Sequence, residues 1–155
     1  MPINTLLEKL QERYGKRLLK IYRKSPKRVY IDMDAKDVVD VVRYLFKEEG
    51  LRFVIASALD ELEGLEILYH FALDTAGVVV SVRVLLADKA NPAIDTITTV
   101  TPAAWWIERE IHELFGIGFR GNEDLRPLLL ADDWPKGVYP LRKDFVAEKR
   151  DSRKT

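Results

Sequence analysis

The sequence predicts an α+β domain with helices packed on one face of a mainly antiparallel sheet, followed by a long extended C-terminal segment. Three stretches of alternating apolar and polar residues, joined by short connections, indicate the strands; they span residues 51–59, 65–73 and 78–86. Apolar residues at helical spacing within 38–46 and 104–115 indicate helices. No helical or strand period follows the last helix. We therefore expect an α+β domain at 1–116 and an extended partner-binding segment at 117–155.

The first helix and two further strands follow from local signals. Thr5 and Glu8 have the spacing of a capping box, so we expect a helix that starts at Thr5 and ends near Gly15. Short strands are expected at 18–23 and 28–32, on either side of a turn that contains a proline.

The two later helices have recognisable ends. Asp34 is suited to cap the N-terminus of the next helix, and Gly50 is suited to end it. Thr101 followed by Pro102 predicts the start of the last helix, with Thr101 as its N-cap. Both helices have an apolar face, which should lie on the sheet.

The composition excludes several classes of function. The chain has 155 residues, of which 47% are hydrophobic, and it has no run near the roughly 18 apolar residues of a membrane span. It has no cysteine, so it cannot form disulfides or ligate iron–sulfur clusters, and its only histidines are His70 and His112. The N-terminus lacks the basic and apolar regions of a secretory signal, so a cytoplasmic location is expected.

Basic residues concentrate near the N-terminus, although the net charge of the whole chain is zero. Residues 9–28 contain one acid, Glu12, and nine basic residues: Lys9, Arg13, Lys16, Arg17, Lys20, Arg23, Lys24, Lys27 and Arg28. One interpretation is a solvated helix face and strand edge, which is the common role of such runs. The other is a surface that attracts an anionic partner, and a nucleic-acid-binding module is one version of it.

The helix over 104–115 has apolar side chains on more than one side. On a helical projection, its core-facing stripe consists of Ala104, Ile107, Ile111, Leu114 and Phe115. Trp105 and Trp106 point away from this stripe, one turn from Arg109. These tryptophans need cover. Either the segment 117–145 folds back over them, or a partner protein covers them.

The same helix offers a candidate metal or catalytic site. Glu108 and His112 are one turn apart and Glu113 is adjacent, so one histidine and two carboxylates could bind a metal. The order His-Glu-Leu-Phe-Gly begins like a zinc-protease motif, but Gly116 stands where the second histidine is needed. A carboxylate/His metal enzyme is therefore kept as an alternative.

The region from Pro102 to Phe145 carries a long and unusual set of motifs. They are Glu108-Arg109-Glu110-x-x-x-Leu114-Phe115-Gly116-Ile117-x-Phe119-x-Gly121, Asp124-Leu125-Arg126, Asp133-Trp134 and Pro140-Leu141-Arg142-Lys143-Asp144-Phe145. This set resembles the 30 kDa subunit family of respiratory complex I, the NADH dehydrogenase of the respiratory chain. That family includes the matching subunits of membrane-bound, energy-converting NiFe hydrogenases and related archaeal complexes. The chain departs from it at 121–127, where Gly-Asn-Glu-Asp-Leu-Arg-Pro replaces the usual Gly-His-Pro-Asp-Leu-Arg-Arg.

The resemblance implies a non-catalytic structural or assembly subunit in the hydrophilic arm of a membrane-associated redox complex. Such a subunit holds no cofactor of its own, and Fe–S clusters with a NiFe or quinone site are expected in neighbouring subunits. The implied partners are a hydrogenase- or complex I-type large subunit and an Fe–S subunit, with no nucleic acid and no membrane span. The implied location is peripheral, on the cytoplasmic side of the membrane. The departures favour a membrane-bound hydrogenase-type complex. An NADH:quinone dehydrogenase, an F420H2 dehydrogenase and a sulfur-reducing complex are the alternatives.

The resemblance also implies which residues face the large subunit. They are Trp105, Trp106, Glu108, Arg109, Glu110, Asp124, Arg126, Trp134, Arg142, Lys143, Asp144 and Phe145. Charge-assisted hydrogen bonds from the charged members of this set would fix the path of the extended segment along its partner.

Overall fold

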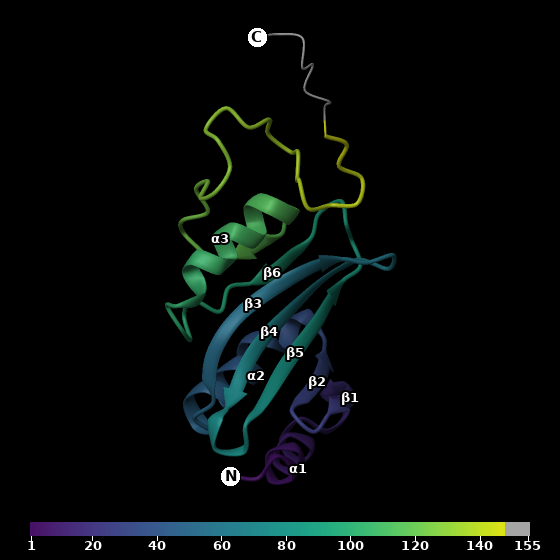
Figure 1. Cartoon of the computed structure of the whole chain (residues 1–155), viewed down its shortest axis with the longest axis vertical. Helices are drawn as coiled ribbons and strands as arrows, with labels where there is room; N and C mark the ends of the chain where they lie inside the picture. The colour runs from purple at the N-terminus through teal and green to yellow at the C-terminus, as the bar shows by residue number, and fades with distance from the viewer. Residues whose placement is uncertain (148–155) are drawn as a thin grey trace.

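The computed structural model describes residues 1–147 and contains a five-stranded mixed sheet, a two-stranded sheet and three α-helices (Figure 1). The helices are α1 (Ile3–Tyr14), α2 (Val38–Arg43), which a π-helical turn at Tyr44–Glu48 continues, and α3 (Ala104–Phe115). The large sheet consists of β1 (Leu18–Ser25), β2 (Arg28–Met33), β3 (Arg52–Asp60), β4 (Leu65–Leu73) and β5 (Val78–Leu86). The small sheet pairs β6 (Ala93–Asp95) with β7 (Gly118–Arg120). The predicted α+β class is confirmed.

The strand order of the large sheet is β1-β2-β5-β4-β3. The pairs β3 with β4 and β4 with β5 are antiparallel as predicted, and the pair β1 with β2, for which no pairing was predicted, is antiparallel as well. The fourth pair, β2 with β5, is parallel and was not predicted; Val29 lies opposite Val80, and Ile31 lies opposite Val82. Alternation of apolar residues marks a strand but does not specify a partner distant in the sequence, so this pairing depends on the tertiary fold.

Three predicted N-caps, at Thr5, Asp34 and Thr101, are wrong. Helix α1 begins at Ile3 rather than at Thr5, and the preceding Pro2 makes no side-chain cap. The earlier start places Ile3 in the core with Leu6 and Leu10, and this burial outweighs the capping box. Helix α3 begins at Ala104, because Thr101 forms a turn in which its carbonyl accepts a hydrogen bond from the Ala104 N–H at 3.1 Å.

The start of the second helix also differs from the prediction. Asp34 precedes a 3-10 turn over Ala35–Asp37, and its side chain makes no cap hydrogen bond. The α-helical part starts only at Val38 and ends before the π-helical turn. The apolar face of this helix is buried as expected, with Val38, Val41 and Val42 in the core.

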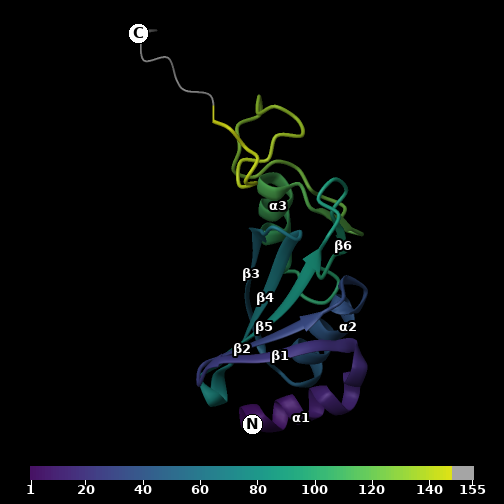
Figure 2. The same cartoon turned by 90° about the vertical axis from the view of Figure 1, so that its right-hand side faces the viewer.

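The core lies between the sheet and the helices. In Figure 1, α1 and α2 lie behind the sheet, and α3 lies at the upper end beside β3; Figure 2 shows the same arrangement from the side. The predicted inward rows of β4 and β5 are confirmed as buried: Leu65, Ile67, Tyr69, Phe71 and Leu73 in β4, and Val78, Val80, Val82, Val84 and Leu86 in β5.

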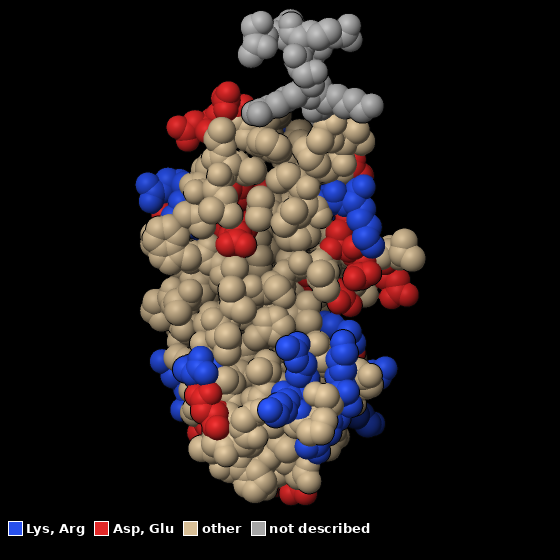
Figure 3. All heavy atoms as spheres, viewed as in Figure 1, with Lys and Arg blue, Asp and Glu red and all other residues tan. Residues whose placement is uncertain are grey.

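The opposite face of the sheet, toward the viewer in Figure 1, carries no helix among residues 1–147. One row across this face runs through Ile55, His70, Ser81, Tyr30 and Tyr22, from β3 to β1. Uncharged atoms cover the part of this face over β3 and β4, whereas Lys and Arg gather over β1 and β2 (Figure 3).

His70 is half-buried in this row and bridges two hydroxyls. Its Nε2 lies 3.0 Å from Ser57 Oγ, and its Nδ1 lies 2.8 Å from Ser81 Oγ. Burial lowers the pKa of His70, and the positive charge of Arg28 lowers it further.

Residues 121–147, here called the C-terminal loop, contain no helix or strand and fold back toward α3 (Figure 1). The Leu141 N–H donates to the Leu114 carbonyl at 3.1 Å, so the loop contacts the C-terminal end of α3. The long extended segment predicted for 117–155 is not seen in the described residues, because Gly118–Arg120 form β7 and residues 121–147 fold back; residues 148–155 lie outside the described residues. None of the helices within the described range is long and apolar enough to cross a membrane.

Candidate partner interface

Helix α3 buries one side and exposes part of the other. Ala104, Ile111 and Phe115 of the predicted stripe are buried, and Ile107 and Leu114 are partly buried against the same core. The two tryptophans on the far side have different environments: Trp105 is half-buried, whereas 56% of Trp106 is exposed.

The C-terminal loop contacts Trp105 directly and is also bonded to Arg109, which lies beside both tryptophans. The Arg109 guanidinium lies 5.3 Å from the ring centres of both Trp105 and Trp106. It donates to the backbone carbonyls of Arg126 at 3.0 Å and Pro127 at 2.9 Å. Trp105 Nε1 donates to the Asp124 carbonyl at 3.3 Å. The chain therefore supplies the cover for Trp105, and Trp106 stays available to a partner.

Glu108 is a buried acceptor within the chain. Its carboxylate accepts from the Thr96 hydroxyl at 2.6 Å, the Ile97 N–H at 2.8 Å and Asn122 Nδ2 at 2.9 Å. Burial raises the pKa of Glu108, and the three hydrogen bonds oppose that rise. This carboxylate ties α3 to the segment after β6 and to the start of the C-terminal loop.

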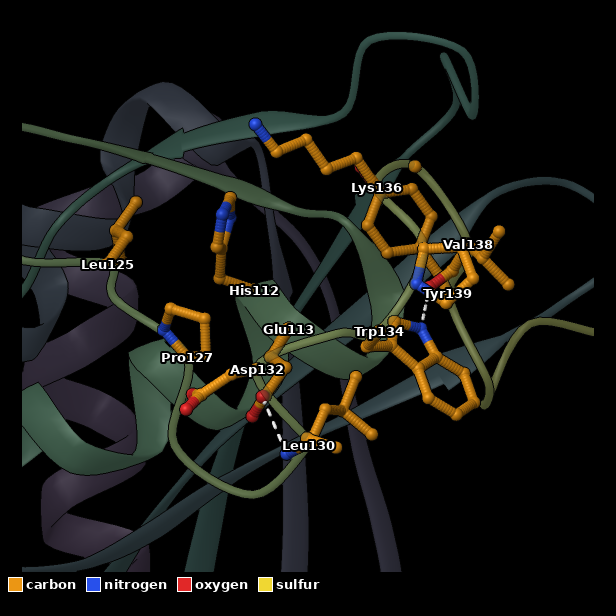
Figure 4. Close-up of a pocket in the computed structure, with 13 residues that line it drawn as sticks. His112, Glu113, Leu125, Pro127, Leu130, Asp132, Trp134, Lys136, Val138 and Tyr139 are labelled. Carbon is orange, nitrogen blue, oxygen red and sulfur yellow. Dashed lines mark hydrogen bonds between the residues drawn. The ribbon is translucent and has the colours of Figure 1, made fainter.

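Glu113 holds the middle of the C-terminal loop against α3. Its carboxylate accepts from the backbone N–H groups of three consecutive residues, Leu128 at 3.2 Å, Leu129 at 2.8 Å and Leu130 at 2.7 Å. Figure 4 shows Glu113 directed at Leu130. Such a cluster of backbone donors is a common way to hold an anion, and here the anion belongs to the chain itself.

The metal-enzyme alternative has no support in this arrangement. His112 Nδ1 lies 2.9 Å from the Ile117 carbonyl, while Glu108 and Glu113 are bonded to separate parts of the backbone. The three side chains do not converge, and the part of the chain that the structure describes contains no group of three His, Asp or Glu residues placed to hold a metal.

Other charged motif residues also bind within the chain. Arg142 donates to the Phe115 carbonyl at 2.6 Å and to the Lys89 carbonyl at 2.9 Å. The Lys143 N–H donates to the Asp60 carboxylate at 2.8 Å. These contacts fasten the end of the C-terminal loop to α3 and to the end of β3.

Asp124 and Arg126 form a local pair, 2.7 Å between Oδ2 and Nη2. Arg126 lowers the pKa of the Asp124 carboxyl to about 2. The Arg126 side chain is exposed while its carbonyl accepts from Arg109, so the residue anchors the loop and leaves its guanidinium at the surface.

The aromatic motif residues of the loop pack on each other. The rings of Trp134 and Phe145 lie 6.0 Å apart, and Trp134 Nε1 donates to the Val138 carbonyl at 2.7 Å. Between this part of the loop and α3 lies a hollow of about 280 Å³ (Figure 4). Its lining includes His112 and Tyr139, so both α3 and the loop form its walls.

A second hollow, of about 320 Å³, lies between α3 and β3 and was not predicted. Val54, Ile55 and Trp106 contribute its exposed apolar side chains, and Glu110 lies at its edge. Val54 and Ile55 are both exposed because the register shifts between Phe53 and Ile55, which turns neighbouring residues outward. The unbroken apolar run 53–56, in a region of otherwise alternating residues, was the sequence signal for this irregularity.

Comparison with known proteins gives consistent results. A family model for the respiratory-chain NADH dehydrogenase 30 kDa subunit matches residues 31–151. The chain is 32% identical to a subunit of the F420H2 dehydrogenase of Methanosarcina mazei over 148 residues, 94% of this chain and 92% of that protein. It is 32% identical over 144 residues, 91% of this chain, to hydrogenase-4 component G of Escherichia coli K12, of which it covers 26%.

A solved structure agrees with these matches. The fold superposes on a chain of the membrane-bound sulfane sulfur reductase, an archaeal respiratory membrane complex, with a TM-score of 0.81. The two chains are 26% identical, and the match covers 92% of this chain and 85% of the other.

Proposed function

The chain belongs to the respiratory-chain NADH dehydrogenase 30 kDa subunit family, and we propose that it is a non-catalytic assembly subunit that packs against the large subunit of a membrane-associated redox complex. In this role it lies on the cytoplasmic side of the membrane and is held there through its partners. Fe–S clusters and the site of catalysis belong to the neighbouring subunits.

This proposal rests on the different environments of the charged and the aromatic side chains of α3. Its charged side chains Arg109 and Glu113 are bonded to the backbone of the C-terminal loop, so they are not free for chemistry on a substrate. Trp106 is left exposed beside Val54 and Ile55. Tryptophan is over-represented among the residues that dominate binding energy at interfaces, and exposed apolar neighbours extend such a surface.

We further propose that the outward side of the C-terminal loop continues this interface. Arg126, Leu129, Lys143 and Asp144 are exposed, although the loop is fastened to α3 from behind. A loop fixed in this way loses little conformational entropy on binding, which favours affinity. The segment 117–155 is the proposed partner-binding part of the chain.

Substitution of Trp106 tests the interface. Trp106→Ala should weaken association with the large subunit by about 2 kcal/mol, or about thirty-fold, because it removes a central aromatic anchor. Leu62→Ala is the matched control, since Leu62 is 92% exposed on the turn after β3. Association is measured by recovery of the large subunit with the tagged chain. Equal recovery with both variants contradicts the proposed interface.

A membrane-bound hydrogenase-type complex is the preferred setting. The departures at 121–127 support this choice, as does the similarity to hydrogenase-4 component G. The similarities to the F420H2 dehydrogenase protein and to the sulfane sulfur reductase chain support the alternatives. Purification of the tagged chain from its native membranes, followed by identification of the large subunit by mass spectrometry, decides between them. Recovery of the chain without any large subunit overturns the assembly role.

A further inference from the structure

Seven of the nine basic residues at 9–28 fall into two sets in the structure. On the side of α1, three cations are neutralised by carboxylates: Lys9 pairs with Glu49 at 2.8 Å, Arg13 with Glu48 at 2.5 Å, and Arg17 with Asp40 at 2.5 Å. For this set, the interpretation as a solvated helix face holds, because the positive charges are balanced within the chain.

The second set lies on the hairpin formed by β1 and β2. Lys24, Lys27 and Arg28 are exposed around its turn, and none has a carboxylate within 4.0 Å among residues 1–147. Arg23 is exposed nearby and donates only to the neutral amide of Asn4, at 3.2 Å. The unbalanced charge acts beyond the hairpin, since Arg28 lowers the pKa of His70. Figure 3 shows the resulting cluster of Lys and Arg at the lower right, over β1 and β2.

We propose that the hairpin cations Lys24, Lys27 and Arg28 bind a carboxylate-rich segment of a neighbouring protein in the same complex. This inference rests on the proposed function, because it requires the chain to reside in a multisubunit assembly. The hairpin lies at the end of the molecule away from α3 and the C-terminal loop (Figures 1 and 2), so this contact is separate from the α3 interface.

The form of the hairpin favours side-chain contacts over addition of a strand. β1 is an edge strand, but its pairing with β2 is irregular at both ends, between Leu18 and Lys20 and between Arg23 and Ser25. Such irregularities twist an edge strand and discourage pairing with another strand. The bound segment is therefore expected to be recognised through its carboxylates.

The surroundings favour a protein segment over a lipid surface. The exposed large apolar side chains of the hairpin, Leu19 and Tyr22, lie on β1 and not at the turn, so the turn itself has nothing to insert among lipid headgroups. At the other end of β2, Asp34 shares a hollow with Glu63, Glu66 and the ion pair of Asp32 with Arg83, 2.7 Å between Oδ2 and Nη2. Asp32 is four residues from Arg28, about 13 Å along the strand, which exceeds the screening length of about 8 Å. A short acidic segment can occupy the cations alone, whereas an extended anionic surface laid along the sheet also meets these carboxylates.

Zero-length cross-linking of the intact complex tests the proposal. A carbodiimide joins a lysine amine to a carboxylate only where the two are in contact. In the complex purified through a tag on this chain, we expect Lys24 or Lys27 to be joined to Asp or Glu of another polypeptide. The Lys9–Glu49 pair is the internal control, since it should give a cross-link within the chain. If that cross-link forms while Lys24 and Lys27 stay unlinked in a complex that retains the large subunit, this inference is wrong and the assembly role stands. Recovery of the chain alone overturns both.

Charge reversal gives a second readout. Lys24→Glu with Lys27→Glu should increase the fraction of the chain released from the complex by a salt wash several-fold. Arg43→Glu with Lys47→Glu, on the exposed side of α2 and its π-helical turn, makes the same change in net charge and should leave that fraction unchanged. Equal release of both variants overturns the proposal. So does binding of the isolated chain to phosphatidylglycerol vesicles or to a single-stranded oligonucleotide, if the hairpin variant abolishes it.

Discussion

In the five-stranded sheet, Tyr69, Phe71 and Val80 are buried among apolar neighbours, whereas none of the described residues after Phe119 is buried. The C-terminal loop is instead held by a few polar anchors, in which Arg109, Glu113 and Arg142 bond to backbone groups. Burial acts over many atoms at once and gives cooperative stability. Single polar anchors stabilise one segment each, so the loop can respond to a mutation or a partner without unfolding of the sheet.

The largest effect is expected in the sheet. Phe71→Ala should lower the free energy of unfolding by about 3–5 kcal/mol, because it removes a fully buried ring and leaves a cavity. Chemical denaturation with fluorescence and circular dichroism measures the change. If the loop is stabilised separately from the sheet, the substitution should raise the rate of proteolysis within the loop only slightly at low denaturant, although it lowers the free energy of unfolding. A loss of unfolding free energy below about 1 kcal/mol would contradict the view that burial in the sheet gives the domain its stability.

A smaller and local effect is expected at Glu113. Glu113→Ala removes the acceptor of three backbone N–H groups, and hydrogen bonds to a charged group contribute about 1.5–3 kcal/mol. Cleavage within the C-terminal loop by a protease should accelerate about tenfold or more, while the midpoint of thermal unfolding changes little. Glu110→Ala, on the same helix, is the control and should leave the cleavage rate unchanged. A shift in global stability instead would show that loop and sheet unfold together.

Glu108, which connects α3 to the start of the C-terminal loop, should make the free energy of unfolding depend on pH. Its pKa in the folded state is raised above 4.5 by burial, so the native state binds more protons than the unfolded state between pH 4.5 and the folded pKa. Stability should therefore fall as pH rises through this window and level off above it, by about 1.4 kcal/mol for each unit of pKa difference. Glu108→Gln should lack this dependence. Denaturation at several pH values measures it, and a wild-type stability that rises through the window relative to Glu108→Gln would contradict the prediction.

The smallest effect is expected at the exposed pair of Asp124 and Arg126. Because Arg126 lowers the pKa of the Asp124 carboxyl to about 2, the contribution of the pair to the loop is present above pH 3.8 and is lost as pH falls through about 2. Carboxyl titration by NMR should show this low pKa, and Arg126→Gln should return it toward 3.8. A value unchanged by the substitution would mean that another group lowers it.

Much of the sheet was predictable because its signals are local. The observed bounds of β4 and β5 equal the predicted ranges 65–73 and 78–86, since alternation and short connections specify strand and neighbour together. The helix N-caps at Thr5, Asp34 and Thr101 were predicted wrongly. At Thr5, burial of Ile3 outweighs a local cap, and at the other two positions the chain forms a turn before the α-helix begins.

The sequence predicts a candidate interface only as a set of residues, which remains a prediction, and the structure shows that two of its members, Glu108 and Arg109, are buried. A sequence cannot distinguish an arginine that binds its own backbone, such as Arg109, from one that faces solvent, such as Arg126. Nor does it indicate that Trp105 and Trp106 have different cover. Val54 and Ile55 belong to this surface only because the pairing register of β3 with β4 is irregular.

From residue order alone, the strands with short connections, the amphipathic helices and the family motifs between Pro102 and Phe145 can be recognised, because each depends on spacing along the chain. Three other features depend on residues that are distant in sequence and meet in space. They are the parallel pairing of β2 with β5, the division of the basic run into balanced and unbalanced sets, and the return of the C-terminal loop over α3. Such contacts are selected by the packing of the whole domain, and that packing places Trp106 and the β1–β2 hairpin on surfaces open to partners.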